Sequence, residues 1–122
     1  MLKISIKTFE NVATLCLRGP VVVGEERPLR MMIETLPKIA TLLLDLTRVT
    51  MIDAAGLGVL LELREKTKVN GTELRLLNPT ERVNRVFEIT RLNTVFEITA
   101  ISVMSVNRIN QAVALRDFAR CA

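Results

Sequence analysis

The sequence predicts a single α/β domain built on one mixed β-sheet, and three observations lead to this prediction. The 122 residues are about the length of one domain and are enough to bury a core. After an initial pair of β-type runs, short apolar runs alternate with segments of helical spacing, in the order β-β-α-β-α-β-α-β-α. This alternation is typical of parallel βαβ crossovers. We therefore expect an initial hairpin, then βαβ crossovers, and about four helices.

The first part of the chain predicts the hairpin and the first helix. Residues 3–8 and 12–18 are β-type runs, and Asn11 between them suits a tight turn. The second run is apolar on both faces, which indicates a strand that is covered on both sides. A helix is expected from about residue 25 to residue 36, with Pro28 in its first turn, where proline is tolerated.

The middle of the chain predicts a central strand and a long helix. Residues 41–46 form a continuous apolar run that is typical of a buried strand, and a second apolar step covers residues 49–52. The spacing is helical from residue 54 to about residue 69. Asp53 is placed to cap this helix, which is worth about 1 kcal/mol. Gly71 accepts the left-handed geometry that ends a helix.

The last third of the chain predicts two strands and two helices. Residues 73–77 alternate as a strand, and Thr80 is placed to cap the following helix. The sequence Val-Phe-Glu-Ile-Thr occurs at residues 86–90 and again nine residues later. We interpret the first copy as helix and the second, within residues 95–103, as strand. The tail over residues 105–119 has helical spacing.

The composition excludes much chemistry. The chain has no His, no Trp and no Tyr, four Phe and three Ser. Without His, neither a Ser–His nor a Cys–His pair can form, and two Cys cannot supply a Cys₄ zinc site. The aromatic side chains that stack single-stranded nucleic acid are largely missing. We therefore expect no catalytic residues, no metal, no cofactor and no nucleic-acid partner.

Charge and hydropathy predict a cytoplasmic protein. Seventeen Lys and Arg against thirteen Asp and Glu give a net charge of +4. Because the basic residues are scattered along the sequence, we interpret them as part of a solvated surface. We do not interpret them as a site that binds phosphates or an acidic partner. No signal peptide is evident, and no apolar stretch approaches the roughly 18 residues that cross a bilayer. Cys16 is expected to be a small buried side chain and Cys121 a free thiol.

The most unusual segment is residues 49–61, where Gly56 and Gly58 lie inside the first turns of an apolar helix. Each glycine costs roughly 1 kcal/mol relative to alanine in a helix interior. Two interpretations stay open. The glycines let the helix pack closely on the sheet, or the short side chains of residues 53–56 let another protein approach closely. The spacing alone favours packing.

The same helix carries apolar residues most of the way round. We expect one side to hold Leu57, Leu60, Leu61 and Arg64. Because Val59 and Leu63 lie on other sides, some apolar side chains should stay exposed unless a partner covers them. Exposed apolar patches of this kind often mark interaction sites.

Residues 44–60 resemble the STAS domain, and among its members the stand-alone bacterial anti-sigma factor antagonists are the most similar. The continuations over residues 70–76 and 82–98 fit the same pattern. The resemblance covers about residues 3–118, so it implies one STAS-like domain over residues 1–122. The fold of that family is a mixed sheet with helices, in agreement with the element order above.

In that family the helix usually begins Asp-Ser-Ser-Gly or Asp-Ser-Thr-Gly. The second hydroxyl is phosphorylated by a partner that is both kinase and anti-sigma factor. Here Ala54 and Ala55 replace the two hydroxyl residues, so Ala55 stands at the phosphoacceptor position and cannot accept a phosphate. The resemblance implies that the partner binds the helix start beside the loop of residues 19–24. The expected contact residues are Asp53, Ala54, Ala55, Gly56, Leu57 and Gly58.

The function that the resemblance implies is transcription regulation: the protein binds an anti-sigma factor or switch kinase and so releases a sigma factor. Two alternatives stay open. One is a STAS scaffold of a stress-sensing assembly, which self-associates through residues 54–63 and 95–104. The other is a cytoplasmic accessory of an anion or lipid transporter.

Catalysis has no support in the residues. Asp45 and Asp53 both have structural roles available, and neither belongs to paired carboxylates or to a glycine-rich phosphate cradle. Thr50 is the only hydroxyl residue between positions 50 and 60. Because Thr50 lies in a β-type run, where threonine is common, we interpret it as a structural residue.

Overall fold

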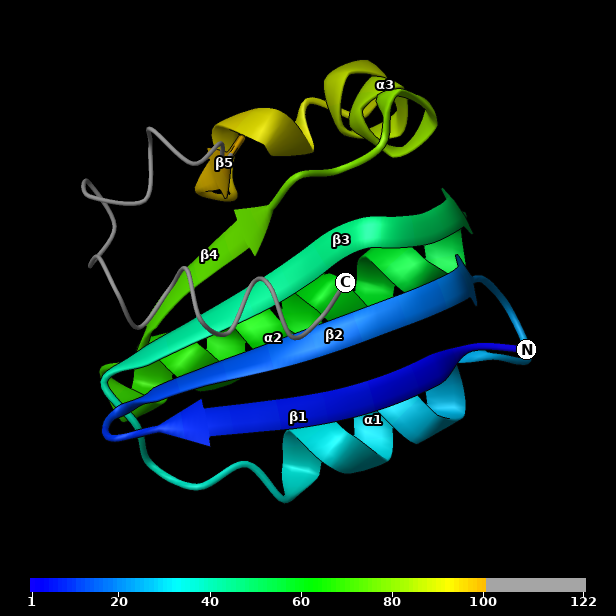
Figure 1. The fold of residues 1–122 in the computed structure, drawn as a ribbon. Coiled ribbons are helices and arrows are strands. Elements are labelled where there is room, and N and C mark those ends of the chain that lie inside the picture. The colour runs from blue at the N-terminus through cyan, green and yellow to red at the C-terminus, as the bar shows by residue number, and fades with distance from the viewer. Residues whose placement is uncertain (101–122) are drawn as a thin grey trace.

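A computed structural model describes residues 1–100, which form a five-stranded mixed sheet with three α-helices (Figure 1). The predicted initial hairpin and βαβ crossovers are confirmed, and the predicted helix at 105–119 lies outside the described residues. The elements are β1 (Lys3–Phe9), β2 (Val12–Val21), α1 (Glu26–Glu34), β3 (Thr41–Ile52), α2 (Ala54–Asn70), β4 (Glu73–Leu77), α3 (Glu81–Ile89), the 3₁₀ turn η1 (Leu92–Thr94) and β5 (Ile98–Thr99).

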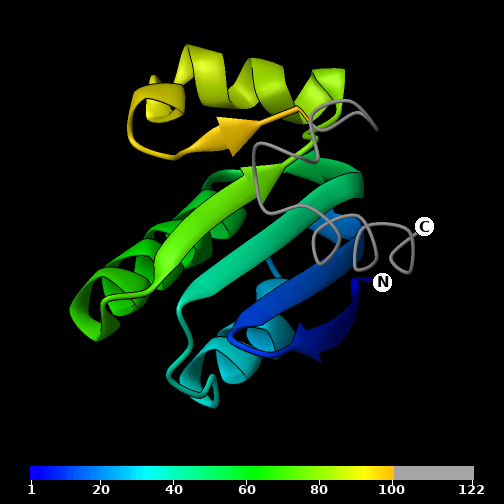
Figure 2. The ribbon, with the colours of Figure 1, turned by 60° about the vertical axis from the view of Figure 1, so that its left-hand side comes forward.

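The strand order follows the chain, β1-β2-β3-β4-β5, with β1 antiparallel to β2 and every later pair parallel. Parallel crossovers are right-handed, so a sheet that grows in one direction receives successive helices on the same face. Figure 2 shows α1 (cyan) and α2 (green) together on one face, with α3 at the β4–β5 end. Within residues 1–100, no helix is long and apolar enough to cross a membrane.

The main core lies between the sheet and these helices and is almost entirely aliphatic. It closes beside α3, where Phe87 and Phe96 lie with their ring centroids 5.9 Å apart. Alternate residues of each strand point to it, as the two-residue period of a strand requires. Its best buried members include Ala13, Leu15 and Leu17 of β2, Leu42, Leu44 and Leu46 of β3, and Val59, Leu60 and Leu63 of α2.

One continuous strand, β3, replaces the two apolar segments predicted at 41–46 and 49–52. Thr47 and Arg48 are both exposed, which interrupts the apolar pattern without ending the strand. The pairing with β2 shifts register at this point, so an extra residue of β3 is accommodated as an irregularity in the ladder.

Only Ile98–Thr99 of the strand predicted over 95–103 pairs with β4 as β5, and residues 101–103 lie outside the described part. Val95 and Phe96 instead follow η1, where the backbone N–H of Phe96 donates to the Leu92 carbonyl at 3.0 Å. Phe96 is buried in the main core beside Phe87. This tertiary contact outweighs the β propensity of the segment.

The expectation for Cys16 is wrong. Its side chain is half-buried, on the strand face that alternates with Leu15 and Leu17, and it is not a free thiol in the structure. Its sulfur therefore points away from the main core. Cys121 lies outside the described residues.

Candidate functional site

The start of α2 is fixed by Asp53, the residue that joins it to β3. The backbone of Asp53 is extended, and its Oδ1 accepts the N–H of Gly56 at 3.0 Å, which confirms the predicted cap. Its Oδ2 accepts the N–H of Val23 at 3.0 Å. One carboxylate therefore fastens the helix start to the loop that follows β2. Figure 1 shows the ends of β2 and β3 side by side there.

The two backbone donors also determine the charge state of Asp53. The hydrogen bond from Val23, followed by that from Gly56, lowers the pKa of the carboxyl group below its ordinary value. A carboxylate at a helix N-terminus also interacts favourably with the helix dipole. The ionised carboxylate of Asp53 therefore holds the loop after β2 and the first turn of α2 in place through its two hydrogen bonds.

The two glycines of α2 have different surroundings. A Cβ on Gly56 would collide with the carbonyl oxygen of Val21 and lie 2.8 Å from Cγ1 of Ile52, so the helix backbone touches the sheet there. A Cβ on Gly58 would meet no atom within 4 Å. Close packing on the sheet therefore accounts for Gly56, while Gly58 has no packing requirement among residues 1–100.

The structure separates the six residues expected to contact a partner into two groups. Ala54 is exposed, and Asp53, Ala55 and Gly58 are half-buried, so these four form the outer side of the helix start. The remaining two, Gly56 and Leu57, are buried under it. Gly56 and Leu57 therefore pack on the core side of the helix start, beneath the four outer residues.

Sequence reasoning missed one exposed apolar residue of this region and named a second only as part of a loop. Met51, two residues before Asp53, is 44% exposed, and Val23, whose N–H is bound to Asp53, is 72% exposed. The available signal was that both lie in apolar runs adjoining an expected loop or helix start. Together with the outer residues of the helix they make up the α2-start surface, defined as Val23, Met51, Asp53, Ala54, Ala55 and Gly58.

The rest of α2 does not offer the apolar patch that the sequence predicts. Leu57, Val59, Leu60 and Leu63 are all buried in the core, whereas Leu61 is 37% exposed and Val69, near the end of the helix, is 85% exposed. Leu61 is a helical neighbour of Leu57 and Leu60 as predicted, but it is exposed while the other two are buried. The four buried residues all belong to the main core, and the helix backbone touches β2 at Gly56.

Asp45 and Thr50, the two other residues considered in the sequence as functional candidates, both lie in β3. Asp45 is buried, and its Oδ1 accepts the backbone N–H of Thr47 at 2.9 Å and the Thr47 hydroxyl at 2.6 Å, beside the register shift of β3. Thr50 is an exposed residue of β3. Among residues 1–100 there is no group of three or more side chains that could hold a metal ion.

Comparison with known proteins places this fold. The sequence matches the STAS domain over residues 3–105. An anti-sigma factor antagonist from Mycobacterium paratuberculosis has a TM-score of 0.75 at 17% identity, over 86% of this chain and 90% of that chain. The anti-sigma factor antagonist SpoIIAA of Bacillus, in its unphosphorylated form, has a TM-score of 0.73 at 18% identity, over 88% and 96%.

A third similar structure is SLC26A9, with a TM-score of 0.63 at 17% identity. It matches 91% of this chain, but the match covers only 21% of that protein. At these identities the likeness shows a shared fold. The sequence match spans most of the chain, and the sheet order and helix placement agree with it. The chain belongs to the STAS domain family.

Proposed function

We propose that this STAS domain is a regulatory binding protein of the anti-sigma factor antagonist kind, which binds an anti-sigma factor or switch kinase and catalyses no reaction. The observation that carries the proposal is the α2-start surface, where the short side chains of the helix start adjoin two exposed apolar residues, Val23 and Met51. The similarity in fold to SpoIIAA and to the mycobacterial antagonist supports it.

The α2-start surface has the properties of a contact site. Val23 and Met51 are exposed, and burial of a side chain of this size contributes about 1.5–3 kcal/mol. Because Ala54 and Gly58 have little or no side chain, together they let a partner's backbone come close to the helix. Asp53 holds the loop and the helix start in one arrangement before binding, which reduces the conformational entropy lost on association.

Ala55 makes this surface permanently neutral at the family's phosphoacceptor position. SpoIIAA has been solved both without and with its phosphate. A phosphate adds about −1.5 to −2 charges, and a partner surface that fits the neutral form would lose affinity. Because Ala55 has no hydroxyl, we propose that binding here is not controlled by phosphorylation of this residue.

The test is a binding measurement with the purified anti-sigma factors and switch kinases of the same genome. We expect wild-type protein to bind one of them and Ala55→Asp to bind it at least tenfold more weakly, because a charge enters the contact. Ala40→Asp is the matched control, since Ala40 is an exposed alanine before β3, at the opposite end of that strand from Asp53. Equal binding by all three proteins would contradict the proposal.

A second measurement concerns the phosphate itself. After incubation with the bound kinase and ATP, the wild-type mass should be unchanged, while Ala55→Ser should gain one phosphate. Thr50 is exposed and is the only other position between 50 and 60 that could be modified. A gain of mass in the wild type would contradict the expectation, and a phosphate found on Thr50 would show that phosphorylation reaches this segment through another residue.

One observation favours a second candidate function, that of a transporter accessory. In SLC26A9, a much longer chain, the matching fold makes up only 21% of the length. Co-purification of the protein with a transporter, and no binding to any anti-sigma factor, would favour this candidate. A scaffold role would be recognised by a sedimentation mass of several copies, whereas a monomer that binds one kinase favours the first proposal. In all three cases we propose a cytoplasmic location.

A further inference from the structure

Three cationic residues lie side by side across the first three strands, on the sheet face opposite α1 and α2. Lys3 of β1 is the register partner of Arg18 of β2, and Arg18 is the register partner of Arg48 of β3. Neighbouring strands are about 4.8 Å apart, so the three residues form a row across the sheet. In the sequence they are widely separated, which is why the basic residues look scattered there.

A row of like charges directly opposite one another is destabilising. Within the described part of the chain, neither Lys3 nor Arg18 belongs to an ion pair that would offset the repulsion. Arg48 has an interaction of its own, so we base the inference on Lys3 and Arg18. Exposed charges held in this arrangement favour an anion between them.

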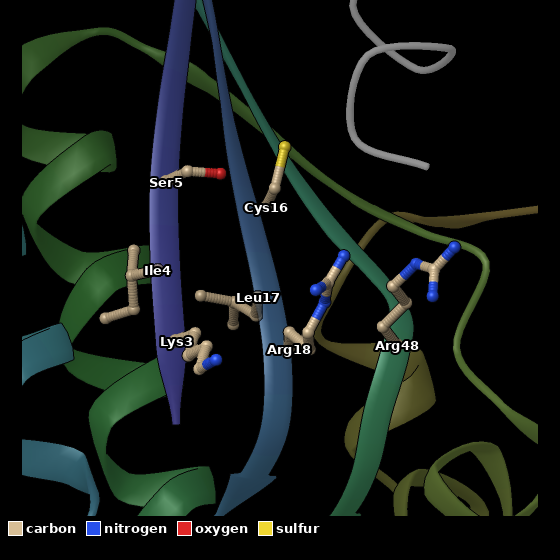
Figure 3. A pocket seen from close by; sticks show the side chains of 7 residues that line it. All are labelled: Lys3, Ile4, Ser5, Cys16, Leu17, Arg18 and Arg48. Carbon is tan, nitrogen blue, oxygen red and sulfur yellow. The ribbon is translucent and has the colours of Figure 1, made fainter. Parts of the chain in front are cut away.

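The row borders a small pocket of about 210 Å³ (Figure 3). Figure 3 shows the guanidinium groups of Arg18 and Arg48 on the same side of the sheet as the Ser5 hydroxyl, whereas Ile4 points toward the helices. The volume is below the roughly 300–1,000 Å³ that is typical of sites for larger ligands. The pocket therefore suits a small anion and combines two kinds of cation with a hydroxyl donor.

We propose that this pocket binds a phosphate group, carried either by a soluble phosphate or by a lipid headgroup. Arg18 presents a planar guanidinium that can donate two parallel hydrogen bonds to phosphate oxygens. Lys3 adds a compact positive charge, and the Ser5 hydroxyl adds a neutral donor. None of the residues that line the pocket belongs to the α2-start surface, so the two sites can be tested with separate variants.

The test is a titration with inorganic phosphate, compared with a titration with sodium chloride at the same ionic strength. The NMR shifts of the backbone amides of β1, β2 and β3 are the readout. We expect saturable shifts in the millimolar range for the wild type. Arg18→Gln should weaken binding at least tenfold, and Ser5→Ala should weaken it less. Arg82→Gln, at an exposed arginine of α3, is the matched control and should bind like the wild type.

A stability measurement guards against a misfolded variant. In chloride alone, Arg18→Gln should melt at the same temperature as the wild type or higher, because the variant relieves the repulsion in the row. Added phosphate should raise the melting temperature of the wild type but not that of the variant. Equal shifts in the two proteins, or no shift in the wild type, would overturn the proposal.

A vesicle assay distinguishes the two sources of a phosphate group. Wild-type protein and Arg18→Gln are sedimented with phosphatidylcholine vesicles that do or do not contain phosphatidic acid. Sedimentation that needs phosphatidic acid and is lost in Arg18→Gln would support a lipid headgroup as the source. If phosphate binds but the protein does not sediment, a soluble phosphate is the ligand.

Discussion

The two glycines of α2 differ in what they do, although only one residue separates them. Gly56 lies against the backbone of β2, where any side chain would collide with Val21. Gly58 faces open space and still weakens the helix, by about 1 kcal/mol relative to alanine. The lack of a packing reason for Gly58 among residues 1–100 agrees with the contact surface proposed at the start of α2.

The pair predicts opposite changes in stability. Gly58→Ala should raise the free energy of unfolding by up to about 1 kcal/mol, because alanine favours the helix and meets no atom there. Gly56→Ala should lower it by about 1–3 kcal/mol or more, through collision with the Val21 carbonyl. Urea denaturation of both variants measures the two values. A Gly58→Ala protein less stable than the wild type would show that Gly58 is needed for packing.

Asp53 predicts a dependence of stability on pH. Its pKa is lowered in the folded protein, so the unfolded state binds the proton more readily. The stabilisation is complete above the unfolded pKa of about 3.9 and is lost as the pH falls through the lower folded value. The stability difference between wild type and Asp53→Asn should therefore be constant near pH 7 and shrink below about pH 4. Denaturation curves at several pH values measure it, and a constant difference down to pH 3 would contradict the expectation.

The residues at helix ends could be predicted because they obey local rules. Asp53 and Thr80 each accept the backbone N–H three residues later, and Gly71 has a left-handed backbone with φ of 71°. The hydrogen bond from Val23 to Asp53 could not be predicted in this way. It joins residues 30 positions apart and depends on β2 and β3 ending at the same edge of the sheet.

Among the elements, α2 shows the limit of helical spacing as a guide. A helix packed closely on a sheet buries more than one stripe, so its apolar residues do not reveal which side faces solvent. The row formed by Leu57, Leu60 and Leu61 is a valid helical neighbourhood, yet Leu60 is 1% exposed and Leu61 is 37% exposed. The structure distinguishes them, because Leu60 belongs to the main core and Leu61 does not.

These neighbouring leucines provide a test of the helix orientation. Leu60→Ala should reduce the free energy of unfolding by about 2–5 kcal/mol, because it leaves a cavity in the core. Leu61→Ala should reduce it by less than about 1 kcal/mol, because its side chain is already partly in water. Chemical denaturation of the two variants compares them directly. Equal losses would mean that the orientation of α2 is wrong.

For the whole molecule, the element order was predictable because each crossover joins neighbouring strands and each strand has an apolar run. The position of β5 was harder to predict, since the first copy of Val-Phe-Glu-Ile-Thr forms the end of α3 and its C-cap, whereas the second forms a turn and a short strand at residues 95–99. The contact between Phe87 and Phe96 decides this difference. The cationic row was not predictable either, because it exists only once the strand register is known.

The contact between Phe87 and Phe96 predicts how the α3 end is held to the rest. Phe87→Ala should cost about 3–5 kcal/mol, since the ring is fully buried. A double-mutant cycle with Phe96→Ala should give a coupling of about 0.5–1.5 kcal/mol for the tilted ring pair. Thermal or urea unfolding of the two single variants and the double variant measures it. Strictly additive losses would contradict direct coupling of the rings.

The strand order has a consequence for how the chain is made. Within residues 1–100, each strand after β1 joins the outer edge of the sheet already present, and none is inserted between two earlier strands. A chain that leaves the ribosome from its N-terminus can therefore add its strands in the order of synthesis. The ribosome would release the hairpin first, and the surface around Asp53 would form when β3 and the first turn of α2 have emerged, well before translation ends.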